Sequence, residues 1–315
     1  MSAAIEAMKQ AYAAVSAGKV AMPIRAHLPI EPHNGVALFM PAFVQSNHGD
    51  ALGVKVVSLF DDNRKRGLAT IQAAVLMLHA ETGQVLALIE GSALTAIRTA
   101  AGSGAATDIL AREDCSTLAI LGAGVQARSH LEAVCTVRDI ETVWIYAPTR
   151  EKVETLVADM GGHAPIPADL RVADNPSQAL KHADIVCTAT SSHTPVFAAG
   201  DLKSDAHINA VGSYTPEMQE VPAAMLPDAL IVVDDRKSAM QEAGDLLIPI
   251  AQGLIQEDHI HAELGEILLG HKPGRSRSEQ LTIFKSVGIA AQDAVAGKLA
   301  LDNAQTMDLG QHIAF

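Results

Sequence analysis

The sequence predicts an α/β protein with two domains, one a doubly wound parallel sheet and the other an α+β domain. Its 315 residues exceed the length that one hydrophobic core usually serves. Hydrophobic residues make up 49% of the chain and aromatic residues only 3%, so the interior must be built from Ala, Val, Leu and Ile. After Asp114, strand-like and helix-like segments alternate, which is typical of a parallel sheet with crossover helices.

The first region has the pattern of an antiparallel sheet with one helix. Apolar residues at helical spacing predict an amphipathic helix over residues 3–17, and Gly18 ends it. Three strands are expected, at residues 36–44, 53–60 and 71–78. A turn separates the first two at residues 48–50. The third strand and the segment 85–89 flank a Gly-containing turn at 80–83, which predicts a hairpin.

The second region alternates strands and helices. Ser92 is the expected N-cap of a long helix rich in small residues, which runs to Arg112. A strand, a Gly-rich turn, a helix and a strand then occupy Thr117–Leu121, 122–124, Val125–Val137 and 143–146. Further strands are expected at 185–189, 208–211 and 230–233, with helical segments at 178–182 and 222–226. A final Ala-rich helix over 289–301 should return to the first domain, so the predicted domains are 1–112 with 287–315, and 113–286.

Charge and cysteine content exclude several classes of partner. The formal charge of -13 would repel a phosphate backbone, so no nucleic-acid partner is expected. Cys115, Cys135 and Cys187 are few, odd in number and far apart, so we expect reduced thiols and no metal site. The N-terminus has no basic patch followed by an apolar stretch, and no apolar run is long enough to cross a bilayer. We therefore expect no membrane partner and a cytoplasmic location.

A GxGxxA pattern lies between the strand at Thr117–Leu121 and the following helix. Gly122 permits a tight turn, Gly124 lets the backbone approach a pyrophosphate, and Ala127 allows close packing of the helix on the strand. The predicted cofactor-binding residues of this turn are Gly122, Ala123, Gly124, Val125 and Gln126. The alternative is a Gly-rich turn without a ligand, but the strand, turn and helix together favour a Rossmann dinucleotide site.

The end of the next strand bears on the choice of cofactor. NAD enzymes usually carry an acidic residue there for the ribose hydroxyls, whereas this chain has Ala147, Pro148, Thr149 and Arg150. Thr149 and Arg150 are suited to bind a 2′-phosphate, since a guanidinium presents a fork of donors. The pattern favours NADP(H), with NAD(H) possible. The alternative is that Arg150 only begins a helix on its solvent face.

Several motifs, in one consistent order, resemble the ornithine cyclodeaminase/mu-crystallin family. They are GVK at 53–55, RGL at 66–68, TAIRTAA at 95–101, LGAGVQA at 121–127, HINAVG at 207–212, EAGD at 242–245, AELGE at 262–266 and FKSVG at 284–288. Together they cover nearly the whole chain. The resemblance implies a homodimer in which the first domain, completed by the C-terminal helix, dimerises and helps form the substrate pocket beside a Rossmann domain.

The resemblance also assigns residues to the substrate site. Arg25, Lys55 and Arg98 match positions that bind the substrate carboxylate and assist the chemistry, and Thr70 adds a polar contact. Arg98 is suited to bidentate binding, while Lys55 among like charges should ionise less readily and donate a proton. Taken singly, each would be interpreted as a surface residue. The resemblance further implies that Val211, Gly212 and Ser286 contact the cofactor.

One departure from the family pattern bears on the reaction. Ornithine cyclodeaminases carry an aspartate shortly after the HINAVG segment, and Tyr214 takes that position here. A phenol does not supply the carboxylate that pairs with a second ammonium, so ornithine cyclodeamination is not expected. We expect reduction of a small cyclic imino acid, Δ1-pyrroline-2-carboxylate or Δ1-piperideine-2-carboxylate. The alternatives are an amino-acid dehydrogenase resembling alanine dehydrogenase, a cyclodeaminase, and a binding protein resembling mu-crystallin.

Overall fold

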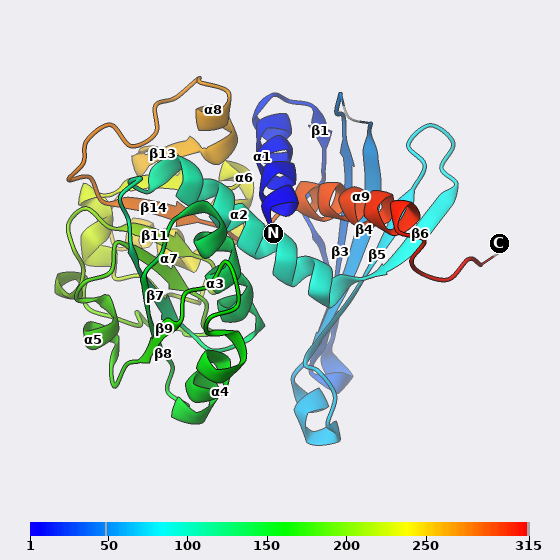
Figure 1. Ribbon diagram of the computed structural model, residues 1–315. Helices are drawn as coiled ribbons and strands as arrows, with labels where there is room; N and C mark the ends of the chain where they lie inside the picture. Colours follow the sequence, from blue (N-terminus) through cyan, green and yellow to red (C-terminus); the bar gives the residue numbers. More distant parts are fainter. Residues whose placement is uncertain (48, 314–315) are drawn as a thin grey trace. The chain divides into compact units, whose positions relative to one another are not determined.

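A computed structural model describes residues 1–47 and 49–313 (Figure 1). The chain forms two compact units: unit 1 contains Met1–Ala13 and Thr99–Gly288, and unit 2 contains Ala14–Arg98 and Ile289–Phe315. Two of the three boundaries fall inside helices α1 (Ser2–Ser16) and α2 (Gly91–Leu110), whereas the sequence places a domain boundary after residue 112. The predicted division of function between 1–112 with 287–315 and 113–286 stays a prediction.

Small side chains explain why the second half of α2 belongs to unit 1. Ala100, Ala101, Ala105 and Ala106 are fully buried there. A Cβ atom at Gly104 would lie 2.9 Å from Cδ1 of Ile5, so α1 approaches the backbone of α2 closely. This contact brings the first 13 residues into unit 1, and apolar periodicity alone does not reveal it.

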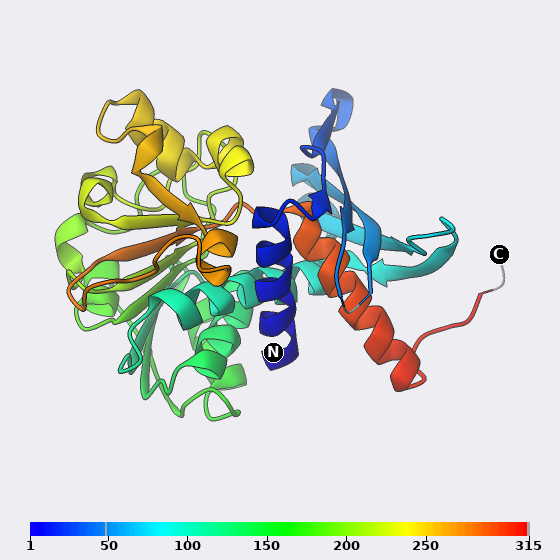
Figure 2. The ribbon, with the colours of Figure 1, turned by 90° about the horizontal axis from the view of Figure 1, so that it is seen from above.

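Unit 2 is built on the antiparallel sheet that the sequence predicts. The strand order is β1-β3-β4-β5-β6, with β2 paired to β3. The strands are β1 (Val20–Ala21), β2 (Ala26–Ile30), β3 (Gly35–Val44), β4 (Ala51–Phe60), β5 (Ile71–Leu78) and β6 (Val85–Glu90). Helix α9 (Ala290–Thr306) packs across β3, β4 and β5 (Figures 1 and 2), so the last helix does return to the sheet of the first region.

The register of this sheet sets Lys55 in an apolar row. Lys55 pairs with Met40 on β3 and with Val75 on β5, and all three side chains are buried on the face that α9 covers. The next row, on the opposite face, pairs Phe39 with Val56, and both of these side chains are partly exposed. Successive residues of a strand point to opposite faces, so the alternation that predicts β4 also fixes the direction of Lys55.

The turn of the predicted β5–β6 hairpin has the expected local chemistry. Gly83, in the turn of the β5–β6 hairpin, has a φ of +73°, and its N–H donates to the carbonyl of His79. His48, in the predicted turn at 48–50, lies outside the described residues. The Asp50 carboxylate accepts a hydrogen bond from the Ser46 amide at 3.1 Å.

Unit 1 contains an eight-stranded sheet in which all neighbouring strands are parallel. The strand order is β13-β12-β14-β11-β10-β7-β8-β9, so the chain reverses its direction of travel across the sheet between β7 and β10. The strands are β7 (Thr117–Leu121), β8 (Thr142–Tyr146), β9 (Asp169–Val172), β10 (Ile185–Thr188), β11 (His207–Ala210), β12 (Leu230–Val233), β13 (Ile260–Glu263) and β14 (Thr282–Lys285). This is the predicted Rossmann-type sheet, and such sheets bind ligands where the strand order reverses.

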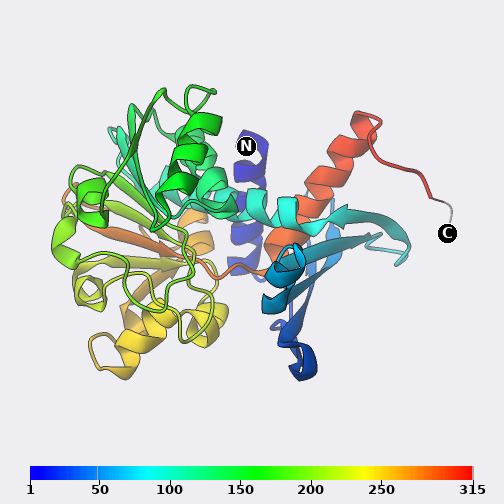
Figure 3. The same cartoon turned by 90° about the horizontal axis from the view of Figure 1, so that it is seen from below.

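Two apolar cores cover the two faces of the parallel sheet. On β7, Leu118 and Ile120 face a core shared with α3 and α4, while Ala119 and Leu121 face a core shared with α5, α6 and α7. These helices are α3 (Val125–Val137), α4 (Arg150–Met160), α5 (Pro176–Leu180), α6 (Arg236–Glu242) and α7 (Gly244–Ala251), and α8 (Leu264–Leu268) follows β13. Figure 3 shows α3 and α4 in green on one side of the sheet and α6 and α7 in yellow on the other. Among the described residues, no helix combines the length and apolar character needed to cross a membrane.

The prediction that Ser92 caps α2 is wrong. The helix begins at Gly91, and the Glu90 carboxylate accepts hydrogen bonds from the amides of Ser92 and Ala93 at 2.8 and 2.7 Å. A carboxylate there satisfies two free N–H groups and meets the positive end of the helix dipole. These contacts hold the pKa of Glu90 below its ordinary value.

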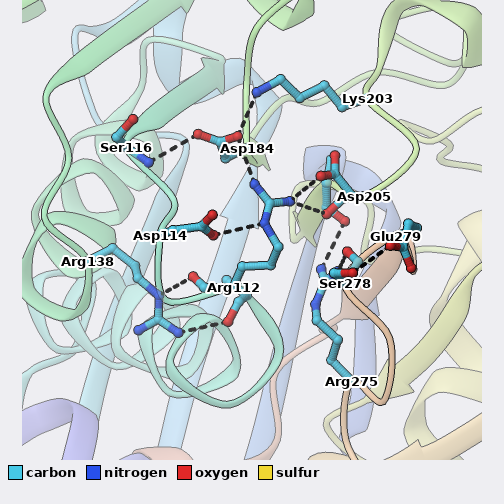
Figure 4. Close-up of polar contacts among 12 residues, drawn as sticks. Arg112, Asp114, Ser116, Arg138, Asp184, Lys203, Asp205, Arg275, Ser278 and Glu279 are labelled. Atoms are coloured by element: carbon cyan, nitrogen blue, oxygen red, sulfur yellow. Dashed lines mark hydrogen bonds and ion pairs between the residues drawn. The ribbon is translucent and has the colours of Figure 1, made fainter.

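Arginines hold the C-terminal end of α2 in unit 1 (Figure 4). Arg138 donates to three backbone carbonyls between residues 107 and 111, and Arg275 donates to the carbonyl of Leu110 at 2.6 Å. Arg112, just beyond the helix, pairs with Asp184 and Asp205. The last carbonyls of a helix lack helical partners, and positive charge is favourable at that end. The three arginines therefore have a structural explanation.

Candidate functional site

The Gly-rich turn after β7 has the shape that a dinucleotide site requires. Gly122 has a φ of +130°, and a Cβ atom there would lie 2.5 Å from the carbonyl oxygen of Ala189. Gly124 is the N-cap of α3, is exposed, and has no heavy atom within 4 Å of the position a Cβ atom would take. Gly122 is thus required by the fold itself, whereas Gly124 leaves room beside the N–H groups that begin α3.

The first turn of α3 adds two further features. Ala127 is fully buried against the sheet, as close packing of this helix demands. The side-chain oxygen of Gln126 is buried and, among the described residues, has no hydrogen-bond partner. An unpaired buried acceptor is costly unless a ligand or water satisfies it. The open space at Gly124 and the unpaired Gln126 oxygen therefore fit a nucleotide cofactor. Ala123 and Val125 are the neighbours of Gly124 in the chain.

The turn after β8 carries Thr149 and Arg150, both exposed, and Thr149 is the N-cap of α4. The Arg150 guanidinium donates to Glu154 at 2.9 Å and to Asp174 at 2.8 Å, and these hydrogen bonds raise its pKa. Surface ion pairs of this kind add little to stability, so a phosphate group could replace either carboxylate at low cost. The structure accordingly leaves Arg150 open both as a helix-start residue and as a phosphate ligand.

A buried carboxylate fixes the loops at the carboxyl ends of β10 and β11. Glu220 accepts hydrogen bonds from the amides of Thr190 and Gly212 at 2.6 and 2.7 Å and from the Thr188 hydroxyl at 2.8 Å. A side chain at Gly212 would collide with the Thr190 carbonyl. The predicted residues Val211 and Gly212 therefore lie in a loop held rigidly by a residue that the sequence analysis did not assign.

The predicted cofactor residue Ser286 is also engaged by a buried acid. Its hydroxyl donates to Asp234 at 2.8 Å, and the amides of Val287 and Gly288 donate to the same carboxylate oxygen. Burial raises the pKa of Asp234, and these hydrogen bonds oppose that rise. The Ser286 hydroxyl can therefore accept a hydrogen bond from a ligand, but its proton is already donated to Asp234.

Unit 2 brings Lys55 and Arg98 to one buried carboxylate. Nζ of Lys55, on β4, lies 2.9 Å from Oδ1 and 2.8 Å from Oδ2 of Asp293 in the first turn of α9. Nε of Arg98, on α2, donates to the same Oδ1 at 3.0 Å. The side chains of all three are at least 94% buried.

Gln292 holds a second nitrogen of Arg98. Nη1 of Arg98 donates to Oε1 of Gln292 at 2.9 Å, and the amide of Ile289 donates to the same oxygen at 3.0 Å. Among the described residues, Nη2 of Arg98 has no hydrogen-bond partner. Two nitrogens of the guanidinium are thus fixed by consecutive residues of α9, and the third remains available for a ligand.

The electrostatic surroundings of Lys55 are those of a residue that exchanges protons near neutral pH. Burial and the nearby charges of Arg98 and Arg25 lower its pKa, Asp293 opposes them, and the net result is a pKa of about 7. Arg25 lies in the segment before β2, and its charge is one of those that act on Lys55. Thr70 precedes β5, where its hydroxyl accepts a hydrogen bond from Arg64. Tyr214 lies in unit 1, exposed, in the loop after β11.

Asp293 and Gln292 are the residues that sequence reasoning missed. They interrupt an Ala-rich helix start, and both are almost fully buried. A signal for them did exist. Cations as buried as Lys55 and Arg98 need an anionic or polar partner, and a polar pair in the small-residue helix predicted to pack on this sheet meets that need.

Comparisons with known proteins agree with this arrangement of sheets and motifs. The sequence profile of the ornithine cyclodeaminase/mu-crystallin family matches residues 1–308. A Δ1-pyrroline-2-carboxylate reductase from Bacillus cereus is 42% identical over 311 residues, which are 97% of this chain and 94% of that protein.

Two solved structures are also similar over nearly their whole length. The Thermococcus litoralis Δ1-pyrroline-2-carboxylate reductase in complex with NADH and L-proline superposes with a TM-score of 0.93 at 38% identity, covering 98% of this chain and 95% of that one. An archaeal alanine dehydrogenase dimer with bound NAD gives a TM-score of 0.90 at 33% identity, covering 99% and 94%. With the family profile matched almost from end to end, this chain belongs to the ornithine cyclodeaminase/mu-crystallin family.

Proposed function

We propose that this protein is an NAD(P)H-dependent reductase that converts a small cyclic ketimine acid into the corresponding amino acid. The substrate is Δ1-pyrroline-2-carboxylate or Δ1-piperideine-2-carboxylate, and the product is L-proline or L-pipecolate. The observation that carries the proposal is the meeting of Lys55 and Arg98 at one buried carboxylate. The likeness to a relative named as a pyrroline-2-carboxylate reductase, and to another solved with NADH and L-proline, supports it.

The charge balance of the cluster suits one carboxylate ligand. Lys55, Arg98 and Arg25 carry up to three positive charges, and Asp293 cancels one of them. The free Nη2 of Arg98 offers two N–H donors to the substrate carboxylate, and Arg25 adds a second cation. We assign Thr70 the further polar contact that the family resemblance implies.

Lys55 is the proton donor in this proposal. When bound, NAD(P)H supplies two electrons and a hydrogen to the imine carbon. The Lys55 ammonium transfers its proton to the imine nitrogen, so that the C=N bond becomes a CH–NH bond and Lys55 is left neutral until solvent reprotonates it. A pKa of about 7 keeps both protonation states accessible at neutral pH, as a group that both gives and regains a proton needs.

Tyr214 favours imine reduction over ornithine cyclodeamination. Its phenol stands in place of the carboxylate that would pair with a second ammonium group. The rival reading is an amino-acid dehydrogenase that acts on pyruvate and ammonia, and the likeness to an archaeal alanine dehydrogenase is the specific observation in its favour. The same cations would bind the pyruvate carboxylate.

For the cofactor we favour NADPH. The turn after β8 has no acidic side chain between residues 147 and 150, while Arg150 presents an exposed guanidinium at the start of α4. Gly122, Ala123, Gly124, Val125 and Gln126 would hold the diphosphate, and Val211, Gly212 and Ser286 would add further contacts to the cofactor. The relatives solved with NADH and NAD support a nicotinamide cofactor without deciding this preference.

We further propose that the active form is a homodimer built on the sheet face of unit 2 that α9 leaves open. Large apolar side chains are exposed on that face: Leu88 is 74% exposed, and Leu86 and Phe39 are 43% and 37% exposed. An exposed apolar patch of this kind marks an interaction surface, and a dimer is known for the alanine dehydrogenase relative. The free, buried cysteines are compatible with the cytoplasm.

A substrate panel tests the function. The purified protein is incubated with NADPH or NADH and Δ1-pyrroline-2-carboxylate, Δ1-piperideine-2-carboxylate, or pyruvate with ammonium, and oxidation of the cofactor is followed at 340 nm. The proposal expects the highest kcat/KM with one of the two cyclic imines. Faster turnover of pyruvate with ammonium would establish the dehydrogenase instead, and tight cofactor binding without any turnover would establish a binding protein.

A further inference from the structure

Two consecutive residues at the start of α9, Gln292 and Asp293, bind the cations of the substrate site from the same side. We propose that they are the positioning residues of this site: Asp293 keeps Lys55 protonated and in place, and Gln292 aligns Arg98 for the substrate carboxylate. This inference rests on the proposed function, because it assigns a task to residues around Lys55 and Arg98. Neither residue was expected from the motifs of the sequence.

Asp293 and Gln292 contact different nitrogen atoms of the two cations. Asp293 contacts Lys55 with both carboxylate oxygens and also accepts from Nε of Arg98. Gln292 contacts Arg98 through Nη1. A planar guanidinium fixed at two nitrogens loses its freedom to rotate, so Nη2 points in one direction.

Gln292 also links this alignment to the start of the helix. Its Oε1 accepts from the amide of Ile289, one of the N–H groups that a helix N-terminus leaves without a partner. The same atom therefore begins α9 and holds Arg98. Any movement of the first turn of α9 would move the guanidinium with it.

Asp293 also supplies the negative charge that partly balances the buried cations of the site. The groups that act on Lys55 are Arg98 from α2, Arg25 from the segment before β2, and Asp293 from α9. The two arginines and burial favour the neutral amine, and Asp293 is the acid that opposes them. Without it, Lys55 would be mostly neutral at pH 7 and would no longer have the proton that reduction requires.

The experiment compares four variants with the wild type: Asp293→Asn, Asp293→Glu, Gln292→Leu and, as a matched control on the same helix, Asp302→Asn. Asp302 is half exposed and, among the described residues, forms a surface ion pair with Lys298, so its loss should leave the kinetics unchanged. The pH dependence of kcat/KM for imine reduction is measured for each. The Lys55 pKa is measured separately, without substrate, by NMR of protein carrying 13Cε-lysine, with Lys55→Arg to assign the signal.

Asp293→Asn should lower the Lys55 midpoint by about 1 to 3 pH units in both measurements, since that is the usual effect of losing one close opposite charge. Asp293→Glu should restore the midpoint while kcat stays reduced, because the charge returns but the added methylene displaces Lys55. Gln292→Leu should raise the KM for the imine about tenfold or more and leave the midpoint unchanged.

Three results would overturn the inference. One is an Asp293→Asn protein that folds and keeps the wild-type Lys55 midpoint by NMR. Another is a Gln292→Leu protein with wild-type KM. The third is an Asp302→Asn control whose kinetics change as much as those of Asp293→Asn and Gln292→Leu. If Asp293→Asn fails to fold, Asp293→Glu and Gln292→Leu still decide between these outcomes. Failure of the proposed function would look different, because the wild type would then not turn over either imine while the Lys55 titration by NMR remained measurable.

Discussion

Nζ of Lys55 lies 2.9 Å from Oδ1 of Asp293, although the two residues are 238 positions apart in the chain. The pair stands on the α9 side of the unit 2 sheet, where every other neighbour of Lys55 in its row is apolar. A buried ion pair of this kind costs much desolvation, and breaking one half of it leaves an unpaired charge. Such an arrangement is poor as a stabilising device and well suited to holding a proton donor.

The first prediction concerns pH. Burial lowers the pKa of Lys55 to about 7, so the protonated donor is present below that pH and is lost above it. The kcat/KM for imine reduction should fall as pH rises through about 7, and that for oxidation of the amino acid should rise over the same range, because oxidation needs the neutral amine. In Lys55→Arg, the change of kcat/KM near pH 7 should be absent for both reduction and oxidation, since a guanidinium does not titrate there. Identical profiles for Lys55→Arg and wild type would exclude Lys55 as the titrating group.

Substitutions at the two cations should separate chemistry from binding. Lys55→Ala should reduce kcat by about 10²- to 10⁴-fold, the usual contribution of a positioned acid, with cofactor affinity retained. Arg98→Ala should mainly raise KM, by about tenfold to a hundredfold, because it removes charge-assisted hydrogen bonds to the substrate carboxylate. Steady-state kinetics and a cofactor titration by fluorescence would measure both. Normal kinetics in either variant would remove that residue from the site.

The sequence predicted the nucleotide part of the fold well, because local chemistry determines it. Residues 117–121 and 125–137 form a strand and a helix with the predicted bounds, since Gly122 and Gly124 mark the turn between them. The strands β9, β13 and β14 mix polar and apolar residues and were missed, whereas the equally short but more apolar strands β10 and β12 were predicted. The boundary inside α2 depends on packing between Gly104 and Ile5, which no local pattern encodes.

The same contrast holds for the candidate site. Lys55 and Arg98 were assigned from motifs, and the structure does bring them together. Their partners Asp293 and Gln292 come from the far end of the chain and lie in no motif that was recognised. Glu220 and Asp234 were missed for a related reason: an acid in a loop is normally solvated, and only the tertiary structure shows that these two are buried among backbone amides.

The glycines at 122 and 124 should respond differently to substitution. Gly122→Ala places a side chain at a φ of +130° and against the Ala189 carbonyl, so it should destabilise the fold by about 1 to 3 kcal/mol or more. Gly124→Val meets open space, so thermal stability should stay near that of the wild type while cofactor binding is lost. Thermal unfolding and isothermal titration with NADPH would check both. Normal cofactor affinity in Gly124→Val would place the diphosphate elsewhere.

Arg150 should decide the cofactor preference. Replacing it with Ala should weaken NADPH binding by about tenfold or more while leaving NADH nearly unaffected, because only NADPH carries a 2′-phosphate for the guanidinium. Glu154→Gln, which removes one of the carboxylates that pair with Arg150, should leave the preference for NADPH in place. Dissociation constants for both cofactors would be compared in each protein. Equal losses for NADPH and NADH in Arg150→Ala would assign the residue to the start of α4 alone.

The open face of the unit 2 sheet should carry the dimer. Pro41, Val54, Leu76 and Leu88 form one row across β3, β4, β5 and β6, on the face opposite Lys55. Leu88→Glu puts a charge where apolar surface would be buried in a dimer, so it should shift the protein toward monomer. Gln84→Glu, at an exposed polar position in the turn between β5 and β6, serves as the control for an added charge outside this face. Sedimentation velocity at several concentrations would measure the shift, and a Leu88→Glu protein with the wild-type sedimentation coefficient would show that the chains associate through another surface or not at all.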